Sequence, residues 1–488
     1  MYLSRRRFIQ AAGAGVAALS VPPLFPQQAW ASGAGEPVIV MLFLRGGADA
    51  LTHVIPHPDR LGGAAYKEAR GAIQLPYQNA IDPAINHQLL TPLHQNFRNG
   101  QTHPADFFAM NSTLNEMLPL YNQSHRDKPK LAVIHAAGNT ETTNRSHFSA
   151  EDAMERGVKL PTDIGDGWLT RAVELLAQKA ENDVLLPLIT TPLTGVSLAA
   201  NPIGSLAGGT RNLSLALASL KDFGLIAPNK VERKTTLASM FDKFPLGPPN
   251  AASSIAQRAG HGLYTALDQL TDELLPTPAT LDDYQRAGLA EMPVSMYGRL
   301  RDAARMIKEP SLGVRAVAID FEGGWDYHTN ILQQTPMYTQ RLAATLSRFY
   351  DDLADGNETH CAADRTVTIV TSEFGRNVGP NGANTEDSGT DHGHGGIMYV
   401  VGKDVVGGRV LSRQLADPPA NEIDNIGWPG LAPDLLEEGR DLKVTIDFRD
   451  VFADVVGHHY GLSPAEVQGL FPSTSGYAPK ALPDSGLF

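Results

Sequence analysis

The chain has 488 residues, of which 42% are hydrophobic and 19% are charged. This composition is typical of a packed globular core and excludes disordered, collagen-like and coiled-coil proteins. The 53 acidic residues outnumber the 40 basic ones, and the formal net charge of -13 argues against nucleic acid as a partner. Cys361 is the only cysteine, so neither an intramolecular disulfide nor a cysteine-rich zinc site can form. These features predict a large α/β protein.

The first 31 residues have the pattern of a signal peptide. Arginines at 5–7 precede an uncharged run over 11–21, and small residues at 29 and 31 fit a signal-peptidase site. The run is too short to span a bilayer. The arginine pair followed by Phe8 and Ile9 resembles a twin-arginine signal. We therefore expect export by the twin-arginine machinery to the periplasm or medium, with no stable membrane span after cleavage. The alternatives are an ordinary secretory signal and an uncleaved anchor.

Five short apolar runs predict buried β-strands. They are rich in Val and Ile, and Gly or polar residues bound each one. The runs are Val38–Leu44, Leu131–Ala137, Val314–Asp320, Thr366–Thr371 and Ile397–Val401. Continuous rather than alternating hydrophobicity favours a parallel sheet that is covered on both faces. We therefore expect a single α/β domain over 32–488, with a doubly wound, mostly parallel sheet and helices on both faces.

Two helices and two irregular segments complete the expected domain. Thr335-Pro336 predicts the start of a helix that stops before Gly356, and a second helix is predicted over Asp447–His459. Between about 192 and 310, glycine- and proline-rich patches predict a largely helical insertion or cap. The tail over 472–488 is rich in Pro, Ser and Gly, so we expect an extended surface segment there.

Polar residues follow four of the predicted strands. In open α/β sheets, ligands bind beyond the carboxyl ends of the strands, so these side chains are expected at one edge. The candidates after the strands are Asp49, Arg145, Ser146, Asp326, His328, Glu373 and Arg376. A glycine-framed loop just before the fifth strand adds Asp391, His392 and His394. Three potential ligands in four residues make this loop the strongest single signal.

Carboxylate oxygens and imidazole nitrogens together suit zinc, manganese or iron. Asp326 and His328, with His392 or His394 from the glycine-framed loop, could hold one divalent cation. Asp49 and Glu373, with one further ligand, could hold a second. We therefore expect one or two metal ions, with zinc or manganese preferred.

A metal pair of this kind would clamp a phosphate-like anion. Coordination favours the alkoxide of a nearby serine, and Ser146 is the candidate nucleophile. Arg145 and Arg376 could pair with the free oxygens of the anion. The sequence thus predicts an anionic ester as the substrate.

Each candidate also has a purely structural interpretation. Asp49 could cap a helix, and Ser146 could be the N-cap of a helix that opens at His147. Glu373 and Arg376 could form a structural ion pair. Isolated histidines such as His135 fit packing roles better than catalysis. The sequence alone leaves these alternatives open.

Five blocks together resemble a known family. The blocks "FLRGGADALTHVIPHPD", "NRSHFSAED", "FEGGWDYHTN", "TSEFGR" and "GTDHGHGG" are similar to those of exported proteins of domain-of-unknown-function family 1501. That family is similar to the alkaline phosphatase superfamily, which includes phosphatases, phosphodiesterases and sulfatases. The resemblance implies a doubly wound α/β sandwich with a dinuclear metal site and a serine, threonine or modified cysteine nucleophile.

Transferred to this chain, the resemblance implies roles for individual residues. Asp49 matches the first-strand aspartate and Ser146 the region of the nucleophile. Asp326 and His328 match one metal site, and His392 or His394 its late histidine. Glu373-Phe374 falls where the superfamily has Asp-His, and a phenylalanine cannot bind a metal. Three options follow: two metals with a rearranged ligand set, one metal, or a site without catalysis.

The resemblance implies an exported metal-dependent hydrolase of phosphate, phosphodiester or sulfate-like esters. The alternative is a catalytically inactive periplasmic binding or assembly protein on the same fold. Cys361 lies outside the Cys-x-Pro-x-Arg pattern, which argues against sulfatase chemistry in particular.

Overall fold

All five predicted strands form in the computed structural model, and they belong to one sheet. They are β1 (Val38–Leu44), β5 (Lys130–Gly138), β8 (Ala316–Phe321), β9 (Thr366–Thr371) and β10 (Gly396–Gly402). β1 and β9 have the predicted bounds, and the other three differ from them by one or two residues at each end. The structure describes residues 35–56, 63–75, 90–92, 108–122, 129–159, 164–183, 193–211, 213–220, 239, 266, 270, 294–321, 324–355, 361–413, 428–473, 476–483 and 486–488.

Among the described residues, the main sheet has nine strands and is mostly parallel. Its order is β11-β5-β10-β9-β1-β8-β6-β7, with β12 paired to β5. The four additional strands are β6 (Gly195–Ser197), β7 (Ser214–Ala216), β11 (Arg409–Leu411) and β12 (Ile446–Asp447). β1 lies parallel to both β8 and β9, whereas β10 is antiparallel to β9 and to β5. The predicted parallel arrangement is therefore confirmed for most strands, and β10 is the exception.

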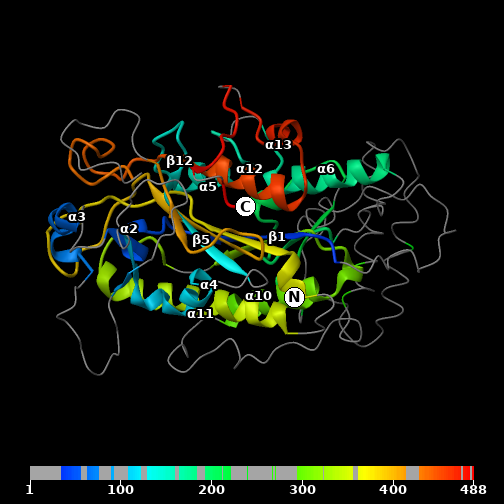
Figure 1. Ribbon diagram of the computed structural model, residues 1–488, viewed down its shortest axis with the longest axis horizontal. Helices are drawn as coiled ribbons and strands as arrows, with labels where there is room; N and C mark the ends of the chain where they lie inside the picture. Colours follow the sequence, from blue (N-terminus) through cyan, green and yellow to red (C-terminus); the bar gives the residue numbers. More distant parts are fainter. Residues whose placement is uncertain are drawn as a thin grey trace.

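Helices cover both faces of this sheet (Figure 1). Along β1, Val40 and Leu42 belong to the core on one face, and Ile39 and Met41 to the core on the other. This alternation follows from the two-residue period of a strand. The first face carries α10 (Val294–Lys308) and α11 (Ile331–Ala354). The second carries α6 (Trp168–Asn182), α12 (Phe448–His459) and α13 (Pro464–Leu470).

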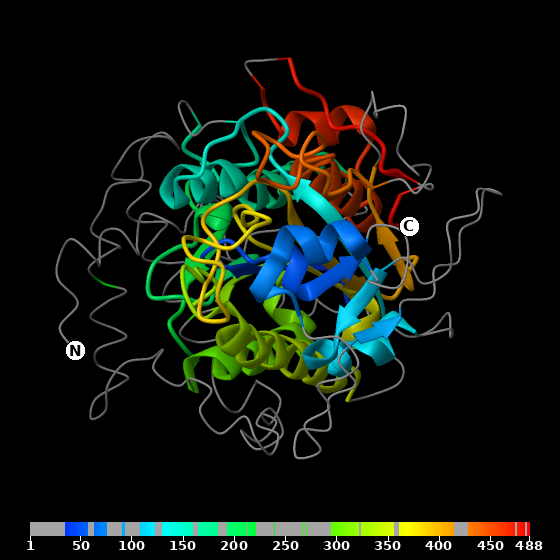
Figure 2. The same ribbon diagram turned by 90° about the vertical axis from the view of Figure 1, so that its left-hand side faces the viewer.

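Figure 2 shows the same arrangement from the side, with helices above and below the sheet. A second, three-stranded antiparallel sheet has the order β2-β4-β3. Its strands are β2 (Val54–Pro56), β3 (Leu90–Pro92) and β4 (Phe108–Asn111). The other α-helices with bounds in the described part of the chain are α2 (Ala50–His53), α3 (Gly63–Arg70), α4 (Leu118–Tyr121) and α5 (His147–Arg156). Short 3-10 helices cover Gly71–Ile73, Ser112–Met117, Gly204–Leu206, Pro310–Leu312 and Ala362–Arg365.

The two predicted helices form, but one of them starts earlier than expected. α12 begins after Asp447, whose side chain accepts a hydrogen bond from the Arg449 amide, as an N-cap does. α11 begins at Ile331 and contains Pro336 in its interior. Ile331 is fully buried against the core, so burial extends the helix beyond the start that the proline signal indicated.

The segment expected to be a helical insertion also contributes strands. β6 pairs in parallel with β8 and with β7, so both short strands widen the main sheet. Strands of three residues are too short for a hydrophobic pattern to reveal. Most of residues 221–293 lie outside the described part of the chain, as does the predicted signal segment over 1–31. Among the described residues of the tail, 472–488, the structure has neither an α-helix nor a strand.

No helix in the part of the chain that the structure describes is both long enough and apolar enough to cross a membrane.

Candidate metal centre

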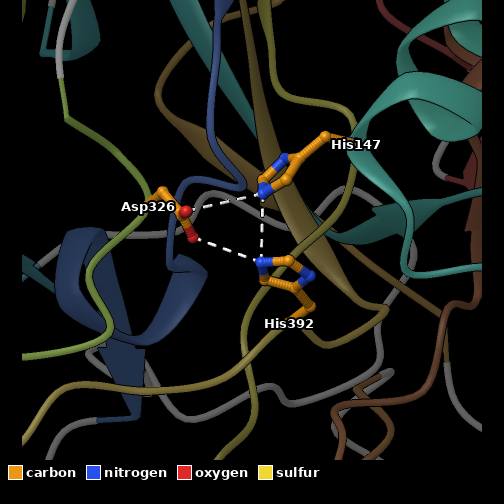
Figure 3. A group of neighbouring side chains, drawn as sticks. All are labelled: His147, Asp326 and His392. Carbon is orange, nitrogen blue, oxygen red and sulfur yellow. Dashed lines mark hydrogen bonds and ion pairs between the residues drawn. The ribbon is translucent and has the colours of Figure 1, made fainter.

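Three histidines and one aspartate converge at the carboxyl edge of the main sheet. His147 is the first residue of α5, which follows β5. Asp326 and His328 lie in the loop after β8, and His392 lies in the loop that leads into β10. Figure 3 shows His147, Asp326 and His392 pointing toward one another. Because β1, β8 and β9 are parallel neighbours, the loops after them meet at the same edge.

The Nε2 atoms of the three histidines surround the Asp326 carboxylate. The Nε2 atoms of His328 and His392 lie 2.9 and 3.2 Å from Asp326 Oδ1. His147 Nε2 lies 3.6 Å from Asp326 Oδ2. His392 Nε2 is in turn 3.0 Å from that of His147 and 3.2 Å from that of His328. We call these four residues the His/Asp cluster.

The opposite ring nitrogens of two of these histidines face hydrogen-bond acceptors. His147 Nδ1 lies 2.7 Å from Glu373 Oε1. His392 Nδ1 lies 2.8 Å from the backbone carbonyl oxygen of Arg145, which can only accept. In neutral rings the proton is therefore on Nδ1 in both cases, and Nε2 carries a lone pair. Metal-binding histidines usually have this arrangement, with Nδ1–H donated to a carboxylate or a carbonyl.

The cluster consequently brings several lone pairs together without intervening hydrogens. Nε2 of His147, Nε2 of His392 and a carboxylate oxygen of Asp326 all lie within 4.8 Å of one another. Electron-rich atoms this close repel each other unless a cation lies between them. Three imidazole nitrogens and one carboxylate oxygen are a suitable ligand set for zinc and also for manganese or iron. The residues present thus fit a divalent cation.

Arg376 holds Asp326 in place from the protein interior. Its fully buried guanidinium donates to Asp326 Oδ1 at 2.6 Å and to the Thr390 carbonyl at 2.5 Å. Burial tends to raise the pKa of Asp326, but Arg376 and the adjacent histidines outweigh it, so the net pKa is below its ordinary value. Gly46 allows the Asp326 loop to approach, because a Cβ there would lie 2.6 Å from the Asp326 nitrogen. The carboxylate is thus both fixed and ionised.

Glu373 lies behind His147 and already has three donors. Its Oε1 accepts from the Gly46 amide at 2.8 Å as well as from His147, and its Oε2 accepts from the Ser372 hydroxyl at 2.9 Å. This hydrogen bond, together with the charge of Glu373, raises the pKa of His147 despite partial burial of the ring. Glu373 therefore orients His147, which is a different role from the direct ligation expected for it. Phe374 packs on the rings of His147 and His392, with centroids 4.9 and 5.0 Å away.

Asp391 is at the outer rim of the cluster. Its Oδ1 lies 3.7 Å from His328 Nδ1, beyond hydrogen-bond distance, and its side chain is 53% exposed. Asp391, His328 and His392 nevertheless have ligand atoms within 4.8 Å of one another. Of the residues predicted from sequence, the structure therefore brings Asp326, His328, His392 and Asp391 together, with Glu373 and Arg376 directly behind them.

Asp49 and His394 do not join the cluster. The Asp49 carboxylate caps α2 and accepts from Arg70 at 2.5 Å, and both side chains are buried. The capping interpretation of Asp49 thus describes its contacts better than the ligand interpretation. His394 is 5% exposed, and its Nδ1 lies 3.0 Å from Asp441 Oδ2. Between the two candidate histidines of the glycine-framed loop, the structure places His392 in the cluster.

Ser146 and Arg145 immediately precede His147. Ser146 is the exposed N-cap residue of α5, but its side chain makes no capping hydrogen bond. Arg145 pairs with Asp441 at 2.5 Å and with Glu438 at 2.9 Å. The guanidinium groups of Arg145 and Arg376 are thus both paired with carboxylates, whereas the sequence suggested that they would face an anion. The suggested Glu373–Arg376 pair is not formed, because Arg376 contacts Asp326.

His147 and Glu151 were not among the site residues predicted from the sequence. His147 directly follows Ser146 in the block "NRSHFSAED". Like Ser146, it comes after a predicted strand and a short loop, and this position could have identified it as a candidate ligand. Glu151 lies one helical turn further along α5, and its carboxylate forms a group with His147 and Glu373 within 4.8 Å. Burial raises the pKa of Glu151 to about 7, with Arg45 opposing the shift and Glu373 adding to it.

The fold and the cluster together define an α/β protein with a candidate metal centre at the carboxyl edge of its sheet. The chain belongs to the family described as "Protein of unknown function (DUF1501)", whose model matches residues 36–471. A solved structure, "Structure of alkaline phosphatase from the Antarctic bacterium TAB5", is similar at 13% sequence identity and a TM-score of 0.24. That similarity covers 77% of this chain and 94% of the other. A search of curated proteins gave no match.

Proposed function

We propose that this protein is an exported, metal-dependent hydrolase of phosphate, phosphodiester or sulfate-like esters. One observation carries the proposal: three imidazole Nε2 atoms meet the Asp326 carboxylate, and two of the rings have Nδ1 on an acceptor. The cluster is also open to a substrate, since Asp326 and His328 have side chains that are 42% and 40% exposed.

His147, His328, His392 and Asp326 would hold one divalent cation. When bound, such a cation stabilises negative charge on an ester group and makes a nearby hydroxyl more acidic. One ion fits better than two, because the Glu373 oxygens already have three hydrogen-bond donors and Asp49 pairs with Arg70. Zinc and manganese are the preferred ions for this ligand set.

Ser146 is the proposed nucleophile. Its hydroxyl is exposed and does not cap α5, so it remains available for chemistry. It stands at the N-terminus of a ten-residue helix, where the helix dipole favours negative charge. The Ser146 oxygen would attack the phosphorus or sulfur of the ester while its proton passes to solvent, and the P–O or S–O bond to the alcohol would break, so that the alcohol leaves. Water would then hydrolyse the bond between Ser146 and the phosphoryl or sulfuryl group and release it as the free acid.

The residues around the cluster fix the orientation of the proposed metal ligands. Arg376 holds the Asp326 carboxylate, and Glu373 and the Arg145 carbonyl direct the lone pairs of His147 and His392 inward. Since Arg145 and Arg376 are both paired with carboxylates, the attraction for an anionic ester comes mainly from the cation.

Metal analysis and an ester screen test the proposal. Protein purified from its native compartment, or loaded with zinc or manganese, is expected to bind about one ion per chain and to hydrolyse aryl phosphates, phosphodiesters or sulfates. Asp326→Ala should abolish both properties. Glu438→Gln, at an exposed carboxylate outside the cluster, is the matched control. Folded protein that binds neither ion would contradict the proposal.

A binding or assembly protein is the second candidate. The observation in its favour is that Arg145 and Arg376 are both already paired, so neither guanidinium is available for a transferring group. Metal-loaded protein that hydrolyses no ester in a broad screen would support this candidate over the hydrolase.

Export by the twin-arginine route is part of the proposal and depends on residues 1–31. A reporter fused to this segment should reach the periplasm, and Arg5→Lys combined with Arg6→Lys should stop it. Export that persists in the double variant would indicate an ordinary secretory signal.

A further inference from the structure

Asp441 is a buried carboxylate just outside the His/Asp cluster. It lies in the segment between β11 and β12, and its side chain is fully buried. Its backbone forms an antiparallel β-bridge with Asn377, whose amide nitrogen donates to the Asp391 carbonyl oxygen at 2.9 Å. Asp441 Oδ2 also lies 3.0 Å from His394 Nδ1. Asp441 is therefore packed against the chain that follows β9 and against the glycine-framed loop.

The first link from Asp441 to the cluster runs through Arg145. Asp441 Oδ2 accepts from Arg145 Nε at 3.0 Å and from Nη2 at 2.5 Å. The backbone carbonyl oxygen of Arg145 lies 2.8 Å from His392 Nδ1. Arg145 also directly precedes Ser146 and His147 in the chain. Because charge-assisted hydrogen bonds to a buried carboxylate are strong, Asp441 fixes the residue whose carbonyl orients the ring of His392.

The second link runs through Asn377. With its NH₂ group facing two oxygen atoms, the Asn377 side chain donates to Asp441 Oδ1 and, at 2.8 Å, to the backbone carbonyl oxygen of His392. The opposite amide orientation would place oxygen against oxygen, so the contacts assign this one. Asn377 thus connects the backbone of His392 to the same carboxylate that holds the partner of its ring.

Both links depend on the buried carboxylate rather than on the surface. A buried charge must be satisfied by donors, and Arg145 and Asn377 supply them to the two oxygens of Asp441. Glu438, the other carboxylate that pairs with Arg145, has a side chain that is 49% exposed. Exposed ion pairs hold their partners weakly. Of the two carboxylates, Asp441 is therefore the one that fixes Arg145.

We propose that Asp441 is a positioning residue of the metal centre. It sets the place of His392 at both ring and backbone, and through Arg145 it fixes the segment that carries Ser146 and His147. It acts through Arg145 and Asn377 and is not itself a ligand. The inference rests on the proposed metal site and adds to it a residue outside the five sequence blocks.

Asp441→Asn tests this role with little change in shape. The new NH₂ group must face the N–H groups of either Arg145 or Asn377, so at least one link breaks. We expect zinc affinity, measured by competition with a chelator, to fall about tenfold or more. The visible spectrum of cobalt(II) bound in place of zinc should also change, because it reports ligand geometry. Glu438→Gln, the matched control at Arg145, should retain both properties. Folded Asp441→Asn with wild-type affinity and spectrum would overturn the proposal.

Asn377→Ala is the second variant. It removes one link and leaves the buried pair of Asp441 and Arg145 in place, so zinc affinity should fall several-fold. If Asp441→Asn does not fold, Asn377→Ala decides, and unchanged affinity would overturn the proposal.

Crystal structures of the metal-free proteins separate this inference from the proposed function. In Asp441→Asn, the distance between His392 Nδ1 and the Arg145 carbonyl oxygen should increase from 2.8 Å to beyond hydrogen-bond distance. Wild-type protein that binds no zinc would contradict the proposed function, and the distance would then decide the role of Asp441. An unchanged distance would contradict that role even if the wild-type protein binds zinc.

Discussion

Nδ1 of His147 lies 2.7 Å from Oε1 of Glu373, so a carboxylate just beyond β9 fixes the ring that begins α5. The contact spans 226 residues of sequence. It explains how two segments that are far apart in the sequence together direct a lone pair toward Asp326.

Replacing Glu373 tests this relationship. In Glu373→Gln, one of the two carboxylate oxygens becomes an NH₂ group, so the donors at Gly46, His147 and Ser372 can no longer all be accepted. We expect metal affinity to fall about 10–100-fold, as is usual when the partner of a ligating histidine is lost. Competition with a chelator of known affinity measures it. Affinity equal to that of the Glu438→Gln control would show that Glu373 does not orient His147.

Ser146→Ala separates the nucleophile from the metal site. Turnover should be lost while metal content stays the same. The stability should change by less than about 0.5 kcal/mol, because the hydroxyl makes no capping hydrogen bond. By contrast, Asp447→Ala removes a cap that does bond the Arg449 amide, and it should destabilise the fold. Full turnover by Ser146→Ala would place the nucleophile elsewhere.

Asp49 and Arg70 form a buried ion pair whose loss should be costly. Asp49→Asn retains a capping side chain for α2 but leaves the Arg70 charge unpaired, and we expect a loss of about 3–5 kcal/mol. Urea unfolding measures it. Adding Arg70→Met should recover part of the loss. Metal content should be unaffected in folded Asp49→Asn, and loss of metal would instead support the ligand role that the family resemblance implied.

Three buried histidines predict acid sensitivity. Burial lowers the pKa of His53, His135 and His459 to about 4, although backbone carbonyls or nearby carboxylates partly oppose this. His135 illustrates the neutral form, since it accepts from Trp428 Nε1 at 3.0 Å and bonds the Val54 carbonyl at 2.9 Å.

In the unfolded chain these rings protonate near pH 6.5, whereas in the folded protein they stay neutral. Above pH 6.5 the rings are neutral in both the folded and the unfolded state, so they do not change the free energy of unfolding. As the pH falls from 6.5 toward 4, the unfolded state binds more protons, and stability should fall by up to about 1.4 kcal/mol per pH unit for each ring. Unfolding by urea at a series of pH values measures this slope. His459→Gln should reduce it and His458→Gln should not, and equal slopes would contradict the assignment.

The sequence by itself determined the central strands, the class of fold and the chemistry available at the sheet edge. Continuous apolar runs such as Val38–Leu44 form strands wherever they are buried on both faces, so local pattern is sufficient for them. The same reasoning placed Asp326 and His328 beyond the end of a strand, where a metal site was expected.

Only the tertiary structure decided which of these residues meet. Sheet order and the path of α5 bring His147 to Asp326, and no spacing in the sequence encodes that distance. Asp49 pairs with Arg70, a contact that depends on how α3 packs, and His394 faces Asp441 while His392 faces the cluster. A ligand set requires ångström precision among distant segments, and packing rather than local propensity supplies it.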